Sequence, residues 1–156
     1  DNSGTYTCTV KPETKWDATE FQRGTSLIIS HYLQLEMDIG SYQILYAWGY
    51  CPYQNWNHTT LGPPPFRPGK LFVSLEFDPV PGTSYDLGKP EDWPIYINPA
   101  LKWVCIGQPE IVDTSTAVRS VEFTQNSVAV INRGKLTAIW LHPEKLPDEI
   151  TITNRH

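Results

Sequence analysis

Apolar and polar residues alternate at every second position over much of this chain, and that period constrains the fold more than any other feature. The clearest examples are Thr5–Val10, Leu27–Met37 and Lys70–Asp78. In such a segment one face enters a core and the other meets water. No segment carries the three–four repeat of an amphipathic helix over about ten residues. The pattern therefore predicts half-buried β-strands.

Further strands are predicted at Tyr42–Tyr50, Leu101–Ile106, Ala117–Phe123, Ser127–Ile131, Lys135–Leu141 and Glu149–Thr153. Turn residues separate them: Asp38–Ser41 joins two strands, and Asn132–Gly134 predicts a three-residue hairpin loop with Gly134 in the left-handed conformation. Eight to ten strands without crossover helices predict a single all-β domain over residues 1–156, an antiparallel two-sheet sandwich of jelly-roll type. Because the chain begins with Asp1 rather than Met, we expect a fragment or a processed product.

The middle of the chain differs from the rest in its proline content. Eleven of the 14 prolines lie between Pro52 and Pro109. Proline cannot donate to a strand ladder, so Pro52–Gly69 and Pro79–Pro99 are predicted to be long, rigid loops. Loops of this length in a compact domain usually have a function.

Charge and hydropathy exclude several classes of partner. The 12 basic residues are scattered among 17 acidic ones, for a net charge of −5. Nucleic-acid binding needs clustered Lys and Arg, so nucleic acid is not expected as the main partner. No apolar run approaches the roughly 18 residues of a membrane-spanning helix, so no membrane insertion is expected.

The three cysteines, Cys8, Cys51 and Cys105, stand far apart. None has the spacing of a zinc ligand, and neither a metal nor another cofactor is expected. Three buried free thiols are the favoured interpretation, because free Cys packs as a small hydrophobe. One disulfide with one free thiol is the alternative.

Aromatic residues gather at the start of the first proline-rich loop. Trp48, Tyr50, Tyr53 and Trp56 lie there, and Trp93 lies in the second loop. Exposed rings on a stiff segment can bind a sugar ring, a peptide or a neighbouring subunit. These five residues are therefore the candidate ligand-binding platform, although some of them could equally cap the core under their own loop.

Two short motifs lie beside these aromatics. Asn57-His58-Thr59 is an N-glycosylation sequon, which predicts a glycan on Asn57 if the chain is secreted. Glu91 and Asp92 form an acidic pair next to Trp93, which is the composition of a glycosidase site. Adjacent side chains tend to point apart, however, and no catalytic motif is present. No catalytic residue is therefore assigned.

Two stretches resemble known families. Asp1–Cys8 resembles the D-x-G-x-Y-x-C segment of immunoglobulin domains. In those domains this strand lies near the end of the chain, so we interpret the match as coincidental. Tyr42–Pro52, Pro68–Pro79 and the hairpin Gly134–Leu141 resemble strands of small RNA-virus coat proteins. That resemblance implies a jelly-roll fold and a role in a viral shell, and the missing basic arm favours a surface or protruding module.

These observations lead to one preferred function and two alternatives. We expect a non-enzymatic recognition module on the virion surface, with copies of itself, neighbouring subunits, or a glycan or protein receptor as partners. The first alternative is an extracellular carbohydrate-binding or immunoglobulin-like domain of cellular origin. The second is a glycan-active enzyme on a β-sandwich, with Glu91 and Asp92 as its carboxylates.

Overall fold

The computed structural model describes residues 6–12, 24–28, 33–49, 56–76, 78–87, 93–110 and 118–143. Every regular element in these ranges is a β-strand, so the predicted all-β class is confirmed. The strands are β1 (Tyr6–Pro12), β2 (Gly24–Ile28), β3 (Leu33–Asp38), β4 (Gln43–Gly49), β5 (Asn57–His58), β6 (Arg67–Leu75), β7 (Ser84–Asp86), β8 (Ile95–Asn98), β9 (Trp103–Gly107), β10 (Val118–Thr124), β11 (Ser127–Asn132) and β12 (Lys135–Leu141).

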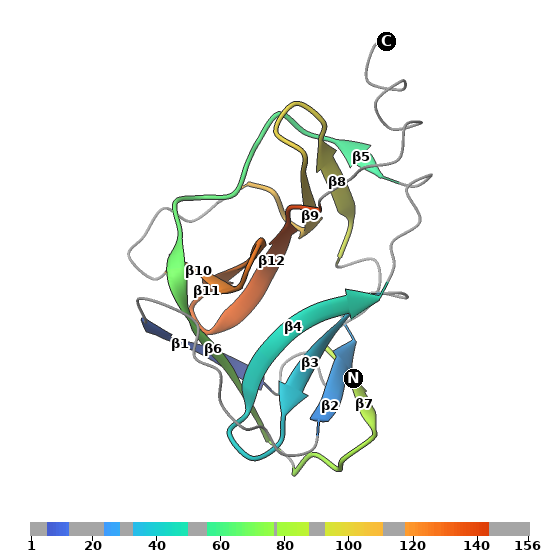
Figure 1. Ribbon diagram of the computed structural model, residues 1–156, viewed down its shortest axis with the longest axis vertical. Coiled ribbons are helices and arrows are strands. Elements are labelled where there is room, and N and C mark those ends of the chain that lie inside the picture. Colours follow the sequence, from blue (N-terminus) through green and yellow to red (C-terminus); the bar gives the residue numbers. More distant parts are fainter. Residues whose placement is uncertain are drawn as a thin grey trace.

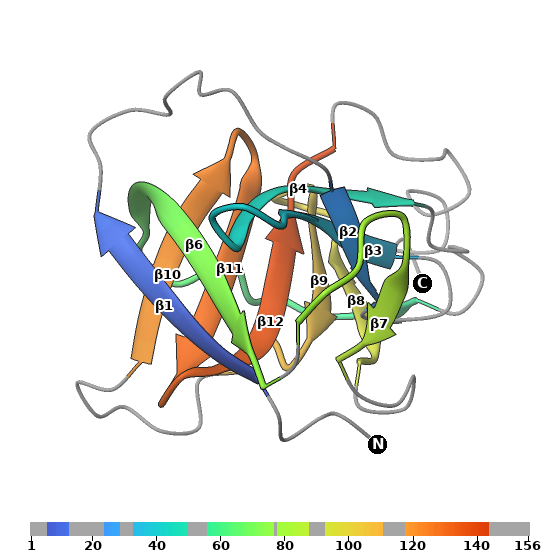
Figure 2. The ribbon, with the colours of Figure 1, turned by 90° about the horizontal axis from the view of Figure 1, so that it is seen from below.

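The strands form one continuous curled sheet. Its order is β5-β8-β9-β12-β11-β10-β6-β4-β3-β2-β7, and β1 pairs with β6 off this path. Most pairings are antiparallel, but β10 with β6, β2 with β7 and β5 with β8 are parallel. Figure 1 shows the β8–β12 and β2–β4 halves of the sheet, and Figure 2 shows how the sheet curls between them. The sheet is a half-barrel, and the expected two-sheet sandwich is not confirmed.

Both halves of the curled sheet contribute to one large core. Leu27 and Leu35 from one half and Val104 and Ile139 from the other belong to the same buried cluster. A smaller cluster, which includes Trp140, contains the alternate residues of β9, β11 and β12. These three strands are therefore buried on both faces, which explains their nearly continuous apolar sequences.

Most of the predicted strands are present with small shifts of their ends. The segments predicted at 5–10, 42–50, 70–78, 101–106, 117–123, 127–131 and 135–141 correspond to β1, β4, β6, β9, β10, β11 and β12. The segment predicted at 149–153 lies outside the described residues. The largest errors concern Leu27–Met37 and the two proline-rich segments.

The prediction of a single strand over Leu27–Met37 is wrong. The chain reverses within this segment, and β2 pairs antiparallel with β3, Leu27 opposite Leu35. Residues opposite each other point to the same face. In this register the partners are both odd-numbered or both even-numbered, so the alternation of the sequence continues across the reversal. The alternation of the sequence therefore gave no indication that the chain reverses between β2 and β3.

The two proline-rich segments contain more strand than predicted. β5 and the start of β6 lie within Pro52–Gly69, and β7 and β8 lie within Pro79–Pro99. Pro68 is the second residue of β6, near the strand start where a missing donor is tolerated. The short strands β5 and β7 lie at the two ends of the sheet path. A short strand at the end of a sheet forms few backbone hydrogen bonds, so a segment of low strand propensity can still pair there.

The turns follow local chemistry that the sequence showed in part. Asn132 pairs with Lys135, and both Arg133 and Gly134 have positive φ. The loop is thus a two-residue hairpin of type I′ rather than the expected three-residue loop, although Gly134 is left-handed as predicted.

A four-residue loop geometry occurs twice. The Asp38 carboxylate accepts hydrogen bonds from the Ser41 backbone N–H at 2.9 Å and hydroxyl at 2.7 Å. In the β8–β9 loop, Asn98 Oδ1 accepts from the Leu101 N–H at 3.0 Å. Both Asp38 and Asn98 are buried, so their side chains fix the two loops from inside.

Candidate binding surface

A β-bulge in β4 creates the most exposed aromatic surface among the described residues. Met37 pairs with Ile44, but Glu36 pairs with Tyr46, so Leu45 is the extra residue on β4. A bulge of this kind reverses which positions face the core. Ile44 lies inside at 0% exposure, whereas Tyr46 and Trp48 are 47% and 45% exposed. The bulge therefore turns two aromatic rings outward on one strand.

The outer faces of four strands continue this surface. The cross-strand registers form two parallel rows, Ser84–Ser26–Glu36–Tyr46 and Asp86–Ile28–Gln34–Trp48. Four neighbouring strands make a face about 14 Å wide, and residues two apart place the rows about 7 Å apart. Together the two rows form what is termed here the aromatic face.

Polar groups on the aromatic face are held in place. The Ser26 hydroxyl donates to Glu36 Oε1 at 3.1 Å. Glu36 lies against Gly24, because a Cβ built at Gly24 would lie 2.2 Å from Glu36 Oε2. Glycine at this position leaves room for the carboxylate. A hydroxyl-bearing ligand on the two rings would thus meet a positioned acceptor in Glu36 and a donor and acceptor in Gln34.

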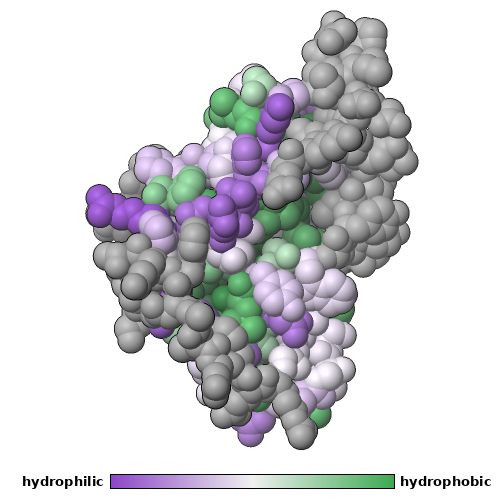
Figure 3. Space-filling model, in the orientation of Figure 1, coloured by the Kyte–Doolittle hydropathy of each residue, from purple (hydrophilic) through white to green (hydrophobic). Residues whose placement is uncertain are grey.

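The surface over β2–β4 differs from the remainder of the visible face. Figure 3 shows mostly pale colours over this half, which mark residues of intermediate hydropathy, and strongly hydrophilic residues over parts of the other half. An aromatic surface with hydroxyl, amide and carboxylate groups has this intermediate character.

The three described aromatics of the predicted platform, Trp48, Trp56 and Trp93, do not form one exposed surface. Trp48 lies on the aromatic face, whereas Trp93 is 6% exposed and part of the core. Trp56 is half-buried and packs against the same core. Among the described residues neither the Trp56 nor the Trp93 indole N–H has a hydrogen-bond partner. Tyr50 and Tyr53 lie outside the described residues.

Trp93 and Trp56 therefore match the alternative in which aromatics cap the core under their own loops. Sequence reasoning missed Tyr46, Gln34 and Glu36. The alternation Tyr42, Ile44, Tyr46, Trp48 suggests a single buried face, and only the bulge at Leu45 separates its two halves. No sequence signal for that bulge was available beyond Leu45 itself, an apolar residue at a position where a polar one would continue the alternation.

Asn57 is exposed on β5, at one end of the sheet path. Its Nδ2 donates to the Ile95 carbonyl at 3.2 Å. The Thr59 hydroxyl accepts from the Leu61 N–H at 3.1 Å. The sequon is thus at the surface of the fold, as its position on a predicted loop required, but on a short strand.

Cys8 and Cys105 are free and buried, and Cys51 lies outside the described residues. Burial raises the pKa of the Cys8 thiol to about 12, although the nearby Lys135 ammonium opposes the change. Burial also raises the pKa of Cys105. Thiols held protonated in this way are poor nucleophiles and poor metal ligands.

Lys135 fixes the start of β1 against the β11–β12 hairpin. Its Nζ donates to the Tyr6 carbonyl at 2.5 Å and lies 4.6 Å from the centre of the Tyr6 ring. The Cys8 N–H donates to the Gly134 carbonyl at 2.7 Å. Burial raises the pKa of Tyr6 to about 12. These contacts therefore connect β1 to the β11–β12 hairpin and have a structural role.

Other kinds of site have little support in the described residues. No three His, Cys, Asp or Glu side chains lie close enough there to hold a metal ion. The same part of the chain contains no helix long and apolar enough to cross a membrane. Glu91 and Asp92 lie outside the described ranges, so the structure does not place the acidic pair.

No family model, no curated protein and no solved structure matches the chain.

Proposed function

We propose that this chain is a non-enzymatic recognition module that binds neutral glycans through the aromatic face. The observation that carries the proposal is the outward pair Tyr46 and Trp48, both nearly half exposed on one strand. Aromatic rings of this exposure cost little conformational entropy to order and bury much area on binding. The apolar C–H face of a pyranose can pack on such a ring.

The polar residues of the face favour a sugar over an apolar protein surface. Gln34 lies directly opposite Trp48, and Glu36 directly opposite Tyr46. Residues opposite each other have Cβ atoms about 5 Å apart, so each ring has a hydrogen-bonding group at its side. Sugar hydroxyls need such partners at the edge of the stacked ring. Glu36 and Asp86 give the face a negative charge, which favours neutral over acidic sugars.

We further propose that the module acts outside the cell, as an external part of a virion. Both halves of the curled sheet contribute residues to one large core, a feature that a jelly-roll-like sandwich shares, and this supports the proposal. A secreted binding domain of cellular origin would use the same aromatic face, and the two contexts differ in assembly and glycosylation.

The test is a glycan array followed by titration calorimetry on the best neutral oligosaccharide. We expect Trp48→Ala and Tyr46→Ala each to weaken binding about 30-fold, the loss typical of a central aromatic contact. Leu101→Ala is the matched control, because Leu101 is 54% exposed and lies on the β8–β9 loop away from the aromatic face. Its affinity should equal that of the wild type.

Light scattering on the same proteins separates ligand binding from self-assembly. If Trp48→Ala caused an oligomer of the wild type to dissociate and no neutral glycan bound the wild type, the aromatic face would be a subunit interface. The glycan proposal would then be wrong. Binding that neither aromatic substitution changes would also contradict it.

A further inference from the structure

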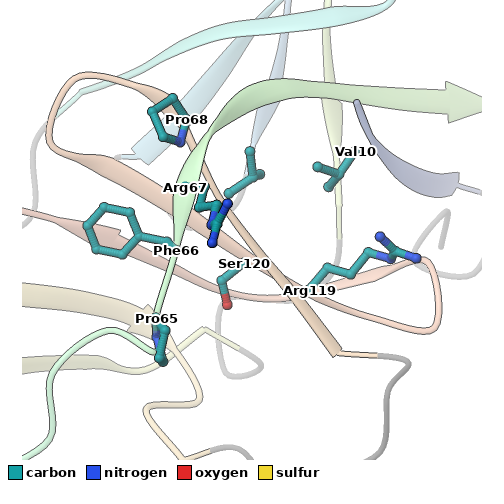
Figure 4. A pocket seen from close by; sticks show the side chains of 8 residues that line it. Val10, Pro65, Phe66, Arg67, Pro68, Arg119 and Ser120 are labelled. Carbon is teal, nitrogen blue, oxygen red and sulfur yellow. The ribbon is translucent and has the colours of Figure 1, made fainter. Parts of the chain in front are cut away.

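A groove lies at one end of the half-barrel, remote in sequence from the aromatic face. It has a volume of about 340 Å³ and lies between β1, β6 and β10 (Figure 4). The residues that line it are Val10, Pro65, Phe66, Arg67, Pro68, Arg119, Ser120 and Val121. Such a volume is at the small end of the range for ligand pockets, and the mouths of β-barrels are common places for them.

The groove lies at the ends of β1, β6 and β10 where the series of inward-facing apolar residues stops. On β1 the inward positions are Tyr6, Cys8 and then Val10. On β10, Phe123 and Val121 are buried, and the next inward position toward this end is Arg119.

β6 shows the same change from apolar to basic. Val73 and Leu71 are buried, and Arg67 is exposed at the equivalent position beyond Gly69. The registers place these ends together, because Arg67 pairs with Val121 and Val10 with Leu71. Arg67 and Arg119 therefore occupy inward-facing positions of β6 and β10, just beyond the last buried residues of those strands.

Among the described residues that line the groove, all charged side chains are basic. None of these residues is acidic, although acidic residues outnumber basic ones by 17 to 12 in the chain. No hydrogen bond or ion pair joins Arg67 or Arg119 to another residue within the described ranges. Two arginines without a partner in the described part of the chain, placed over apolar side chains, make a local positive potential that attracts anions.

The positions of the polar groups indicate the size and charge of the anion. Figure 4 shows the Arg67 guanidinium above the Ser120 side chain, while Arg119 extends to the other side of the groove below Val10. A single guanidinium matches a planar carboxylate, which it can bind with two parallel hydrogen bonds. A phosphate dianion would favour several donors converging on one point, and the two arginines do not converge.

We propose that this groove binds an organic carboxylate about the size of a monosaccharide. The Arg67 guanidinium binds the carboxylate, the apolar body lies on Val10 and Val121, and Arg119 contributes its charge from the opposite side. Either an acidic sugar or a free organic acid supplies this chemistry. The inference is independent of the proposed function, since none of these residues belongs to the aromatic face.

The test is to titrate the folded chain with methyl glucuronide, neutral methyl glucoside and benzoate. Binding is monitored by two-dimensional NMR. A ligand of this size should bind with a dissociation constant on the order of 1 mM. We expect shifts for methyl glucuronide, for benzoate or for both, and none from the same groove for methyl glucoside. Glucuronide alone would identify an acidic sugar as the ligand, and benzoate alone a free acid.

Substitutions then locate the site. Arg67→Gln should weaken carboxylate binding at least 10-fold, and Arg119→Gln should weaken it less and reduce its salt dependence. Lys102→Gln is the matched control, because it removes the same charge from an exposed residue outside the groove. Equal binding of glucuronide and glucoside, absence of binding by both carboxylates, or equal losses in Arg67→Gln and Lys102→Gln would each overturn the proposal.

Discussion

Three glycines with positive φ allow the packing of the half-barrel to be tested by graded substitution with alanine. Gly107, at the end of β9, has φ +118° and is the tightest position. A Cβ there would lie 2.3 Å from the Thr137 carbonyl oxygen and 2.9 Å from Ala138 Cα. Both atoms belong to the backbone of β12, so neither can move aside cheaply. Gly82 has φ +77° and nothing within 4 Å of its Cβ position.

The expected losses differ by the steric part alone. A non-glycine residue in such a backbone conformation costs about 1–2 kcal/mol, which is the whole expected effect of Gly82→Ala. Gly107→Ala adds the overpacking of a buried strand pair, about 1–3 kcal/mol, for a total of about 4 kcal/mol. Gly134→Ala should lie between them, because its Cβ would lie 3.0 Å from the Thr7 methyl group and in ordinary contact, at 3.9 Å, with the Cys8 carbonyl oxygen.

Urea unfolding, monitored by tryptophan fluorescence, measures the loss of stability in all three variants. With a slope near 2 kcal/mol per molar urea, the midpoint should fall by about 2 M for Gly107→Ala and by about 0.5–1 M for Gly82→Ala. If Gly107→Ala cost no more than Gly82→Ala, the close approach of β9 to β12 would be wrong, and with it the placement of the β9–β12 half of the sheet.

Two further outcomes follow from buried and exposed polar groups. Burial raises the pKa of Cys8 to about 12 and also raises that of Cys105, whereas the unfolded thiols ionise near 9.0. The contribution of these two thiols to stability should therefore be constant below pH 9 and fall above it, by up to about 1.4 kcal/mol per pH unit and thiol, and a flat urea-unfolding profile from pH 8 to 11 would contradict this. Secretion from eukaryotic cells should add glycan mass at the exposed Asn57, and Asn57→Gln should remove it; an unmodified wild-type mass would refute the surface position of the sequon or its use.

Alternation was enough to predict the class of the fold but not the order of its strands. Segments such as Lys135–Leu141 keep their predicted bounds because each strand places every second residue in the core. The curled sheet depends on pairings between strands far apart in the chain, such as Arg67 with Val121, and no local period encodes such a pairing. Short strands such as β7 gain their stability from position in the sheet rather than from propensity.

The candidate sites show why side-chain chemistry alone misplaces function. Trp93 and Trp48 looked equivalent in sequence, yet one is in the core and the other on the surface. Proline next to Trp93 suggested an exposed loop, but the neighbouring strand β8 is part of the sheet and brings the indole inward. Arg67 and Arg119, 52 positions apart in sequence, line one groove only because β6 and β10 run parallel at that point.

One residue decides whether the aromatic face exists. Without Leu45 as the extra residue, Glu36 would pair with the residue now at 45 and the positions of Tyr46 and Trp48 would continue the inward series that begins at Ile44. Two large rings would then compete for a core that Leu35 and Met37 already fill at 0% exposure. Close packing allows little room for them, so the bulge relieves the core and creates the binding surface in the same step. Structure and proposed function thus depend on the same local departure from alternation.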